Sequence, residues 1–118
     1  MVEFVIVLPV LLMLLFGVIQ FGIAYFNYLT VTDAARIGAR KAAVSRLATP
    51  SPEEVSEAAV RAAARDLDQS KLNVTVVETA WTHGANVTVT ATYPYEVNLL
   101  GFVVASGRVS SSTTERVE

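Results

Sequence analysis

The sequence has 118 residues, enough for one small domain. Hydrophobic residues make up 53% of it and the mean hydropathy is +0.47, values that are high for a soluble protein of this size. The formal net charge of −2 gives no electrostatic basis for binding nucleic acid, and the absence of cysteine excludes disulfides and thiolate metal sites.

The hydrophobic excess lies near the N-terminus, where no charged residue occurs from Phe4 to Thr32. A membrane-spanning helix needs about 20 mostly apolar residues, and this segment is long enough. The start lacks the basic residues of a secretory signal, and no small-residue cleavage site closes the run. A simple anchor is awkward too, because no Lys or Arg precedes the span. The third interpretation is a pilin-like helix that has lost a short basic leader.

Glu3 stands at the edge of this apolar run, and two interpretations of it stay open. A carboxylate near a helix N-terminus interacts favourably with the helix dipole at an interface. In the core of a filament it would instead need a positive partner, such as the free N-terminal ammonium of an adjacent subunit. A proline in the run should kink or open the helix, and two glycines permit close helix approach. The predicted assembly residues are therefore Glu3, Phe4, Pro9, Gly17 and Gly22.

The second half of the same helix has a different composition. Small residues recur there at i, i+4 spacing and form a stripe against which a helix or sheet can pack closely. Charged residues fall on the other faces, so the helix should be apolar all round at first and amphipathic afterwards. We assign 1–48 to a transmembrane or filament-core helix. The predicted packing seam consists of Ala34, Ala35, Gly38, Ala39, Ala42 and Ala43.

Residues 49–118 are predicted to form a small head. Ser51, Pro52 and Glu54 match the N-cap, N1 and N3 positions of a capping box, which predicts a helix over 52–67. Valine and threonine alternate further along, predicting strands at about 72–80, 86–93 and 107–116. Pro94 should stop the second strand or place its end at a sheet edge. The expected fold class is α+β, with a long apolar helix, a short helix and a small three-stranded antiparallel sheet.

Sites with chemistry are not expected. His83 is the only histidine, so no metal cluster can be built around it, and no nucleophile–base constellation or phosphate loop is recognisable. We therefore expect no enzyme activity, no cofactor, no metal and no small-molecule substrate. Asn73 and Asn86 begin Asn-Val-Thr sequons and are possible glycosylation sites, although threonine-rich strands produce this pattern by chance.

Three segments together resemble a known family: Val2-Glu3-Phe4-Val-Ile-Val-Leu-Pro9, the leucine-rich run to Phe16-Gly17, and Asp33-Ala-Ala-Arg-Ile-Gly-Ala-Arg40. They are similar to the TadE-like family, pilin-like proteins of tight-adherence pilus systems that are related to type IV pilins. The resemblance implies cleavage by a prepilin peptidase after a glycine, leaving a glutamate at the fifth mature position. Here the glutamate is third, so two mature residues are missing from the sequence, cleavage differs, or Met1 is an initiator.

The resemblance implies a reduced pilin fold and a structural role. The expected function is a subunit that polymerises with identical copies, through its apolar helix, into a pilus. The expected partners are the membrane before assembly, a prepilin peptidase and the pilus assembly machinery, with a cell-surface location afterwards. A minor pilin that initiates or caps assembly, and a membrane-anchored binding module, are the alternatives.

Overall fold

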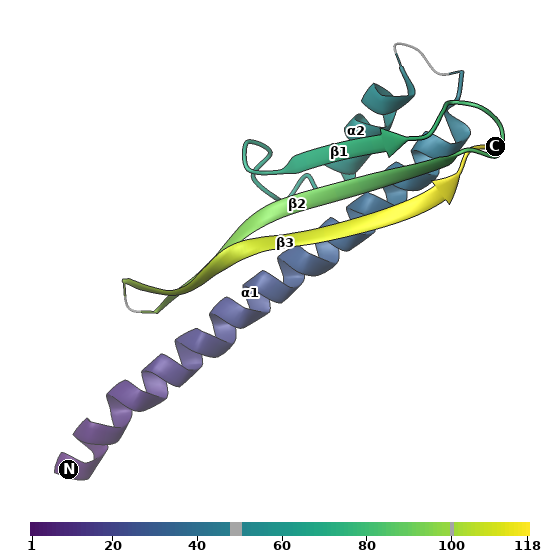
Figure 1. Cartoon of the computed structure of the whole chain (residues 1–118). Coiled ribbons are helices and arrows are strands. Elements are labelled where there is room, and N and C mark those ends of the chain that lie inside the picture. Colours follow the sequence, from purple (N-terminus) through teal and green to yellow (C-terminus); the bar gives the residue numbers. More distant parts are fainter. Residues whose placement is uncertain (48–50, 100) are drawn as a thin grey trace.

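The computed structural model describes residues 1–47, 51–99 and 101–118. Its elements follow one another as α1 (Val2–Val44), α2 (Pro52–Ala63), β1 (Asn73–Glu78), β2 (Asn86–Leu99) and β3 (Phe102–Arg116). The molecule measures 71 × 22 × 17 Å, because α1 extends far beyond the head formed by the other elements (Figure 1). The N-terminus is the free end of α1, and the C-terminus lies in the head. The predicted fold class, a long apolar helix with a short helix and an antiparallel sheet, is confirmed.

The helix α1 runs without interruption through Pro9 and ends at Val44, somewhat before the predicted limit of 48. At about 1.5 Å per residue its 43 residues are about 65 Å long. The last carbonyls of a helix have no partner within it, so they need other donors. Here the backbone N–H of Ser45 donates to the carbonyl of Ala42 at 3.2 Å, and that of Glu118 donates to the carbonyl of Ala43 at 3.0 Å. The C-terminus of the chain therefore helps to close the end of α1.

The short helix α2 begins as the sequence predicts. Ser51 is its N-cap, and the Ser51 hydroxyl accepts a hydrogen bond from the backbone N–H of Glu54 at 3.2 Å. The predicted end at residue 67 is wrong, because α2 stops at Ala63. The side-chain amide of Gln69 donates to the carbonyls of Ala64 and Leu67, at 2.9 and 3.3 Å, and so satisfies them without further helical turns.

The sheet is antiparallel with the strand order β1-β2-β3. The predicted end of the second strand at residue 93 is wrong, since β2 continues through Pro94 to Leu99. The predicted start of the third strand at 107 is also wrong, since β3 begins at Phe102. Pro94 is tolerated because the pairing of β1 with β2 ends at Thr92, so β2 has a partner on only one side there. The two longer strands therefore form a hairpin that projects beside α1.

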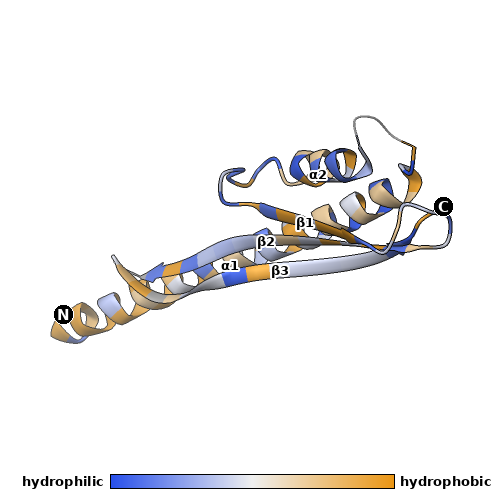
Figure 2. Ribbon diagram, turned by 45° about the horizontal axis from the view of Figure 1, so that its top comes forward, coloured by the Kyte–Doolittle hydropathy of each residue, from blue (hydrophilic) through white to orange (hydrophobic). Residues whose placement is uncertain are grey.

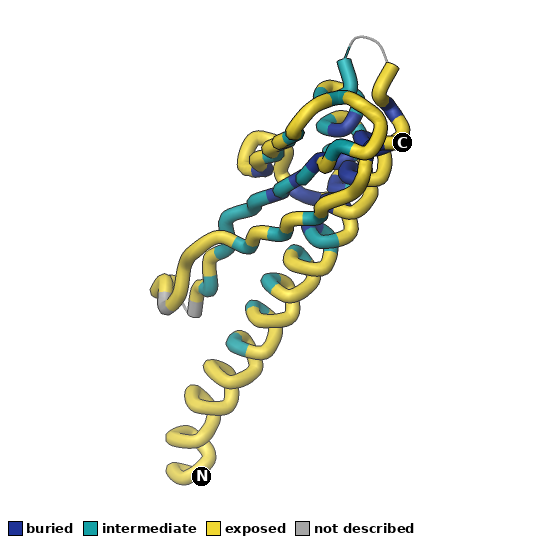
Figure 3. Tube along the Cα trace, turned by 45° about the vertical axis from the view of Figure 1, so that its right-hand side comes forward, coloured by how far each residue is buried: buried dark blue, intermediate teal, exposed yellow. Residues whose placement is uncertain are grey.

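The core lies where α1 meets the head (Figure 3). Small side chains of α1 pack between α2 and the inner face of the sheet, so that the backbone of α1 approaches both closely. A side chain at Gly38 would overlap Val60 of α2 and would place its Cβ 3.2 Å from Cγ1 of Val89 in β2. The largest fully buried hydrophobic side chains of this core are Leu72, Val31, Val60, Val87, Val89 and Val117.

Candidate membrane and assembly surface

The first two-thirds of α1 is an uncovered apolar surface. Twenty large hydrophobic side chains between Phe4 and Leu29 are each 40–70% exposed. The most apolar 18-residue window of the helix has none of its residues buried, and the helix is long and apolar enough to cross a membrane. At about 25 cal/mol per Å² of apolar surface, leaving twenty such side chains in water costs on the order of 40 kcal/mol. This surface therefore needs a lipid or protein environment (Figure 2).

The predicted assembly residues differ in where the structure places them. Glu3 lies in the first turn of α1 and is exposed, as is Phe4, and Pro9 lies inside the continuous helix. Gly17 is half-buried, on the side of α1 that faces the sheet. A Cβ at Gly22 would meet nothing within 4 Å. Among the residues that the structure describes, none therefore requires glycine at position 22, and a close approach there would involve another molecule.

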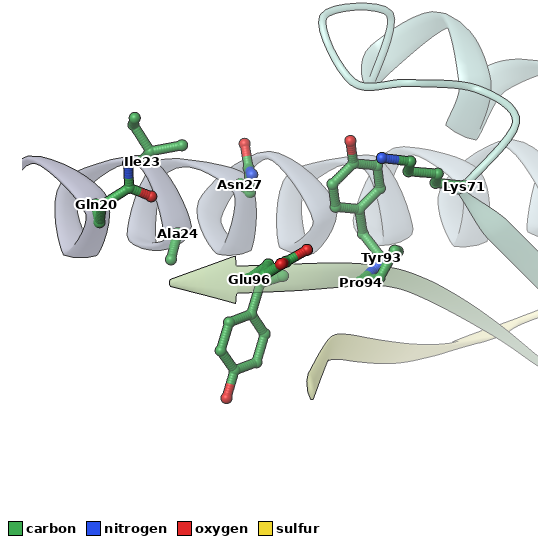
Figure 4. A pocket seen from close by; sticks show the side chains of 9 residues that line it. Gln20, Ile23, Ala24, Asn27, Lys71, Tyr93, Pro94 and Glu96 are labelled. Carbon is green, nitrogen blue, oxygen red and sulfur yellow. The ribbon is translucent and has the colours of Figure 1, made fainter. Parts of the chain in front are cut away.

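One side of the apolar segment is polar, and sequence reasoning missed it. Gln20 and Asn27 are half-buried, whereas the large apolar side chains next to them in α1 are at least 40% exposed. They line a groove of ≈ 460 Å³ between α1 and β2 (Figure 4). The detectable signal was their spacing of seven residues, which places both on one helix face. The groove is lined by Gln20, Ile23, Ala24, Asn27, Lys71, Tyr93, Pro94, Tyr95 and Glu96.

The end of this groove at Tyr93 is held by hydrogen bonds in the loop between α2 and β1. The hydroxyl of Tyr93 accepts a hydrogen bond from the backbone N–H of Asp68 at 3.3 Å. The hydroxyl of Ser70 donates to the Asp68 carboxylate at 2.7 Å, and its backbone N–H donates at 3.0 Å. These two hydrogen bonds, with a smaller contribution from the charge of Lys71, lower the pKa of Asp68. The groove thus places the charged side chains of Lys71 and Glu96 at the junction between the apolar segment and the head.

All six residues of the predicted packing seam are buried in the molecule. The seam is joined to α2 by a buried hydrogen bond in which the Ser56 hydroxyl donates to the carbonyl of Gly38 at 2.9 Å. The C-terminal end of the chain also reaches this region, since Val117 is fully buried and hydrogen-bonds Ala85 and Gly84 through its backbone. One face of the second half of α1 is therefore covered by other parts of the same chain.

The outer face of the sheet carries exposed polar groups. Asn73 and Asn86, the sequon residues, are exposed at the starts of β1 and β2. Beside them the hydroxyls of β2 and β3 pair across the strands. The hydroxyl oxygens of Thr88 and Thr114 are 2.8 Å apart, and those of Thr90 and Ser112 are 2.7 Å apart.

A second polar contact joins α2 to the loop after β1, where Trp81 Nε1 donates to the carboxylate of Glu53 at 2.8 Å. Among the residues that the structure describes, no three His, Asp or Glu side chains gather to hold a metal ion.

Comparison with known proteins bears on the N-terminal segment. Residues 1–40 match a family model described as TadE-like protein, so the resemblance seen in the sequence is confirmed over these residues. They contain the whole apolar segment and the first part of the packing seam. No curated protein and no solved structure matches this chain. The family match and the exposed apolar helix are consistent with a pilus-associated protein anchored in a membrane.

Proposed function

We propose that this chain is a pilin-like structural subunit, held in the membrane by α1, that polymerises through the same helix into an extracellular pilus filament. One observation carries the proposal. The large apolar side chains between Phe4 and Leu29 are exposed on a helix that projects from a head whose core is complete without them. The TadE-like match of residues 1–40 supports it.

The exposed side chains suit both stages of such a life cycle. In the membrane they face lipid, and in a filament they face the helices of neighbouring subunits. Lipid tails are about as apolar as leucine, so leaving the membrane gives no hydrophobic gain when the new environment is protein. Assembly must therefore depend on close packing and on polar contacts between subunits. Gly22, which has open space around it, suits a close helix contact with a neighbour.

Glu3 is the polar contact that we propose for assembly. Its carboxylate would lie inside a bundle of apolar helices, where an unpaired charge is costly. The free N-terminal ammonium of a neighbouring subunit would neutralise it. This pair would align adjacent helices along the filament and would make assembly depend on the mature N-terminus. Phe4 and Pro9 would lie along the same interface, whereas Gly17 faces the hairpin of its own chain.

The proposed partners are identical subunits, a prepilin peptidase and the pilus assembly machinery. We propose neither an enzyme activity nor a small-molecule substrate or nucleic acid ligand. Two related roles give different results in the same experiment. A minor pilin would initiate or cap filaments and be a trace component of them, and a binding module would use α1 only as a tether.

The experiment is to shear filaments from cells that produce the chain, image them and identify the dominant protein. Two variants are compared with the wild type: Glu3→Ala, and a chain whose residues 4–29 are replaced by a leucine–alanine helix of the same length. The subunit proposal predicts that this chain dominates the filaments and that both variants lose them. Trp81 fluorescence of the purified variants should match the wild type, which controls for folding of the head.

Other results would contradict the proposal in different ways. Filaments in which this chain is a trace component would indicate a minor pilin. If both variants behaved like the wild type in this experiment, the chain would be a tethered binding module, because a tether requires only an apolar helix of sufficient length.

A further inference from the structure

The hairpin formed by β2 and β3 ends in an apolar tip. Between Glu96 and Arg108 the sequence has no charged residue. Two large side chains at this end are strongly exposed, Phe102 by 75% and Val103 by 52%. Gly101, with a φ of 87°, lies in the connection between the strands. Exposed apolar side chains at the tip of a hairpin contribute nothing to the core of the head and indicate a contact with something else.

This tip lies beside the apolar half of α1 rather than at the far end of the head (Figure 1). Val97 and Ala105, which pair across the hairpin, line an apolar groove with Phe21 and Ala24 of α1. Phe102 lies about two residue pairs further toward the N-terminal end of α1, or about 7 Å at the usual strand rise. That distance corresponds to between four and five helical residues at about 1.5 Å each. Phe102 is therefore level with about residues 16 and 17, well inside the charge-free run.

Charged and aromatic residues mark where a bilayer surface would lie. A hydrocarbon core about 30 Å thick accommodates about 20 helical residues, so a span beginning at Phe4 would end near Ile23. Tyr25 and Tyr28 follow directly, in the place where aromatic residues concentrate at a membrane interface. On the hairpin, Glu96 and Arg108 both lie on the head side of Val97. The charges of the hairpin thus stay at or above this boundary, while Phe102 and Val103 fall below it.

We propose that the tip of the β2–β3 hairpin inserts into the outer leaflet of the membrane beside α1, so that the membrane-held subunit touches lipid at two points. This inference rests on the proposed membrane-held state. Phe102 and Val103 are the inserted side chains, and the occupant of this surface is lipid, namely the upper acyl chains of the outer leaflet just below the headgroup boundary. The head is thereby held at a fixed angle to α1 and to the membrane surface before assembly.

The hairpin can enter only to a limited depth. Its strands satisfy one another's backbone groups along their shared side, but in the described part of the chain no further strand pairs with their outer edges near the tip. Unpaired backbone groups are costly in hydrocarbon, where water is absent. Interfacial segments typically bury their apolar residues about 5–10 Å into the boundary region. The tip reaches about 10 Å below the level of Ile23 by the helical rise, which agrees with this range.

The experiment measures the depth of single labelled sites in the full-length chain. Because the sequence contains no cysteine, Val103→Cys, Leu14→Cys and Val77→Cys each create one labelling site. Val77 is the matched control, an exposed valine on the outer face of β1. Each variant carries an environment-sensitive fluorophore in phosphatidylcholine–phosphatidylglycerol vesicles, with a nitroxide either near the headgroup or near the end of the acyl chains.

We expect the labels at positions 103 and 14 both to be quenched, with a larger ratio of shallow to deep quenching at 103 than at 14, and the label at 77 to be quenched by neither nitroxide. Phe102→Asp should reduce the quenching at position 103, whereas Thr75→Asp, an exposed change on the outer sheet face, should not. Phe102→Cys provides a second tip site if Val103→Cys does not fold, with Trp81 fluorescence as the folding control.

The remaining results overturn the inference and show what fails with it. Quenching at 14 without quenching at 103 would reject the inserted tip while leaving the membrane-held subunit intact. Absence of quenching at both positions would reject the membrane-held state as well. A blue shift at 103 that grows with the protein-to-lipid ratio, without nitroxide quenching, would mean that a second copy of the chain covers the tip.

Discussion

The two halves of α1 belong to one continuous helix but have opposite surroundings. Up to about Leu29 its large side chains are exposed, whereas from Val31 onward one face is buried against α2 and the sheet. The difference follows from side-chain size. Alanine and glycine allow the head to reach the helix backbone, while the leucines and phenylalanines before them project from the helix. One element therefore serves as the core of the head and as a surface for something outside the chain.

The largest expected effect comes from placing a charge in the exposed half. Leu14→Asp should weaken membrane insertion by about 2.5–3.5 kcal/mol, the cost of an aspartate near the centre of a span. The unfolding of the head should not change, because the Leu14 side chain is 66% exposed and lies outside the buried core. Partitioning of the chain between vesicles and solution measures the first quantity, and Trp81 fluorescence during denaturation measures the second. A loss of head stability would show that the two halves are not independent.

Two glycines of α1 provide a matched comparison of the halves. Gly38→Ala should destabilise the head by about 1–3 kcal/mol, because its methyl group would overlap Val60 and crowd Val89. Gly22→Ala should leave the head unchanged, since a Cβ there meets nothing within 4 Å. Chemical denaturation in detergent compares the two variants. Equal effects of the two substitutions would contradict the division of the helix.

The hydrogen bond between α2 and α1 has a smaller expected effect. Ser56→Ala removes the buried bond from the Ser56 hydroxyl to the carbonyl of Gly38, and should cost about 1 kcal/mol of unfolding free energy. Ser106→Ala serves as the control, because Ser106 is an exposed serine of β3 far from the seam. If both variants unfold at the same denaturant concentration, this bond does not hold α2 to the seam.

The smallest effect should appear on lowering the pH. The hydrogen bond from Trp81 lowers the pKa of Glu53 below its ordinary value of 4.5. The stabilisation is therefore complete above pH 4.5 and is lost as the pH falls through the lowered pKa. Trp81 emission should change over this interval in the wild type and in Asp68→Asn, but not in Glu53→Gln. A change that persists in Glu53→Gln would assign it to another group.

The sequence predicts the helices better than the hairpin, for physical reasons. The charge-free run, the small-residue stripe and the cap at Ser51 are local signals, and each leads to the element found. Pro94 and the polar residues after it look like the end of a strand, and only pairing with β3 shows why β2 continues to Leu99. Similarly, Gln20 and Asn27 look like isolated polar residues until β2 is placed beside them. Neither feature is encoded within one short window.

What lies beyond a single chain is harder to predict. The exposure of the apolar half shows that it needs a cover, but the same side chains suit lipid and neighbouring helices equally well. The packing seam had no such ambiguity, because α2 and the sheet belong to the same chain and bury all six of its residues. The functions proposed for Glu3, Gly22 and the hairpin tip depend on molecules outside the chain, and so require experiments on membranes and filaments.

The most direct test of the account is the reactivity of single cysteines in sheared filaments. Leu14→Cys lies in the apolar half and Val77→Cys on the outer face of the sheet, and both are exposed in the isolated chain. If the apolar half forms the filament core, a water-soluble maleimide should label position 77 and leave position 14 unreacted until the filaments are dissociated. Equal labelling of the two positions in intact filaments would contradict the account.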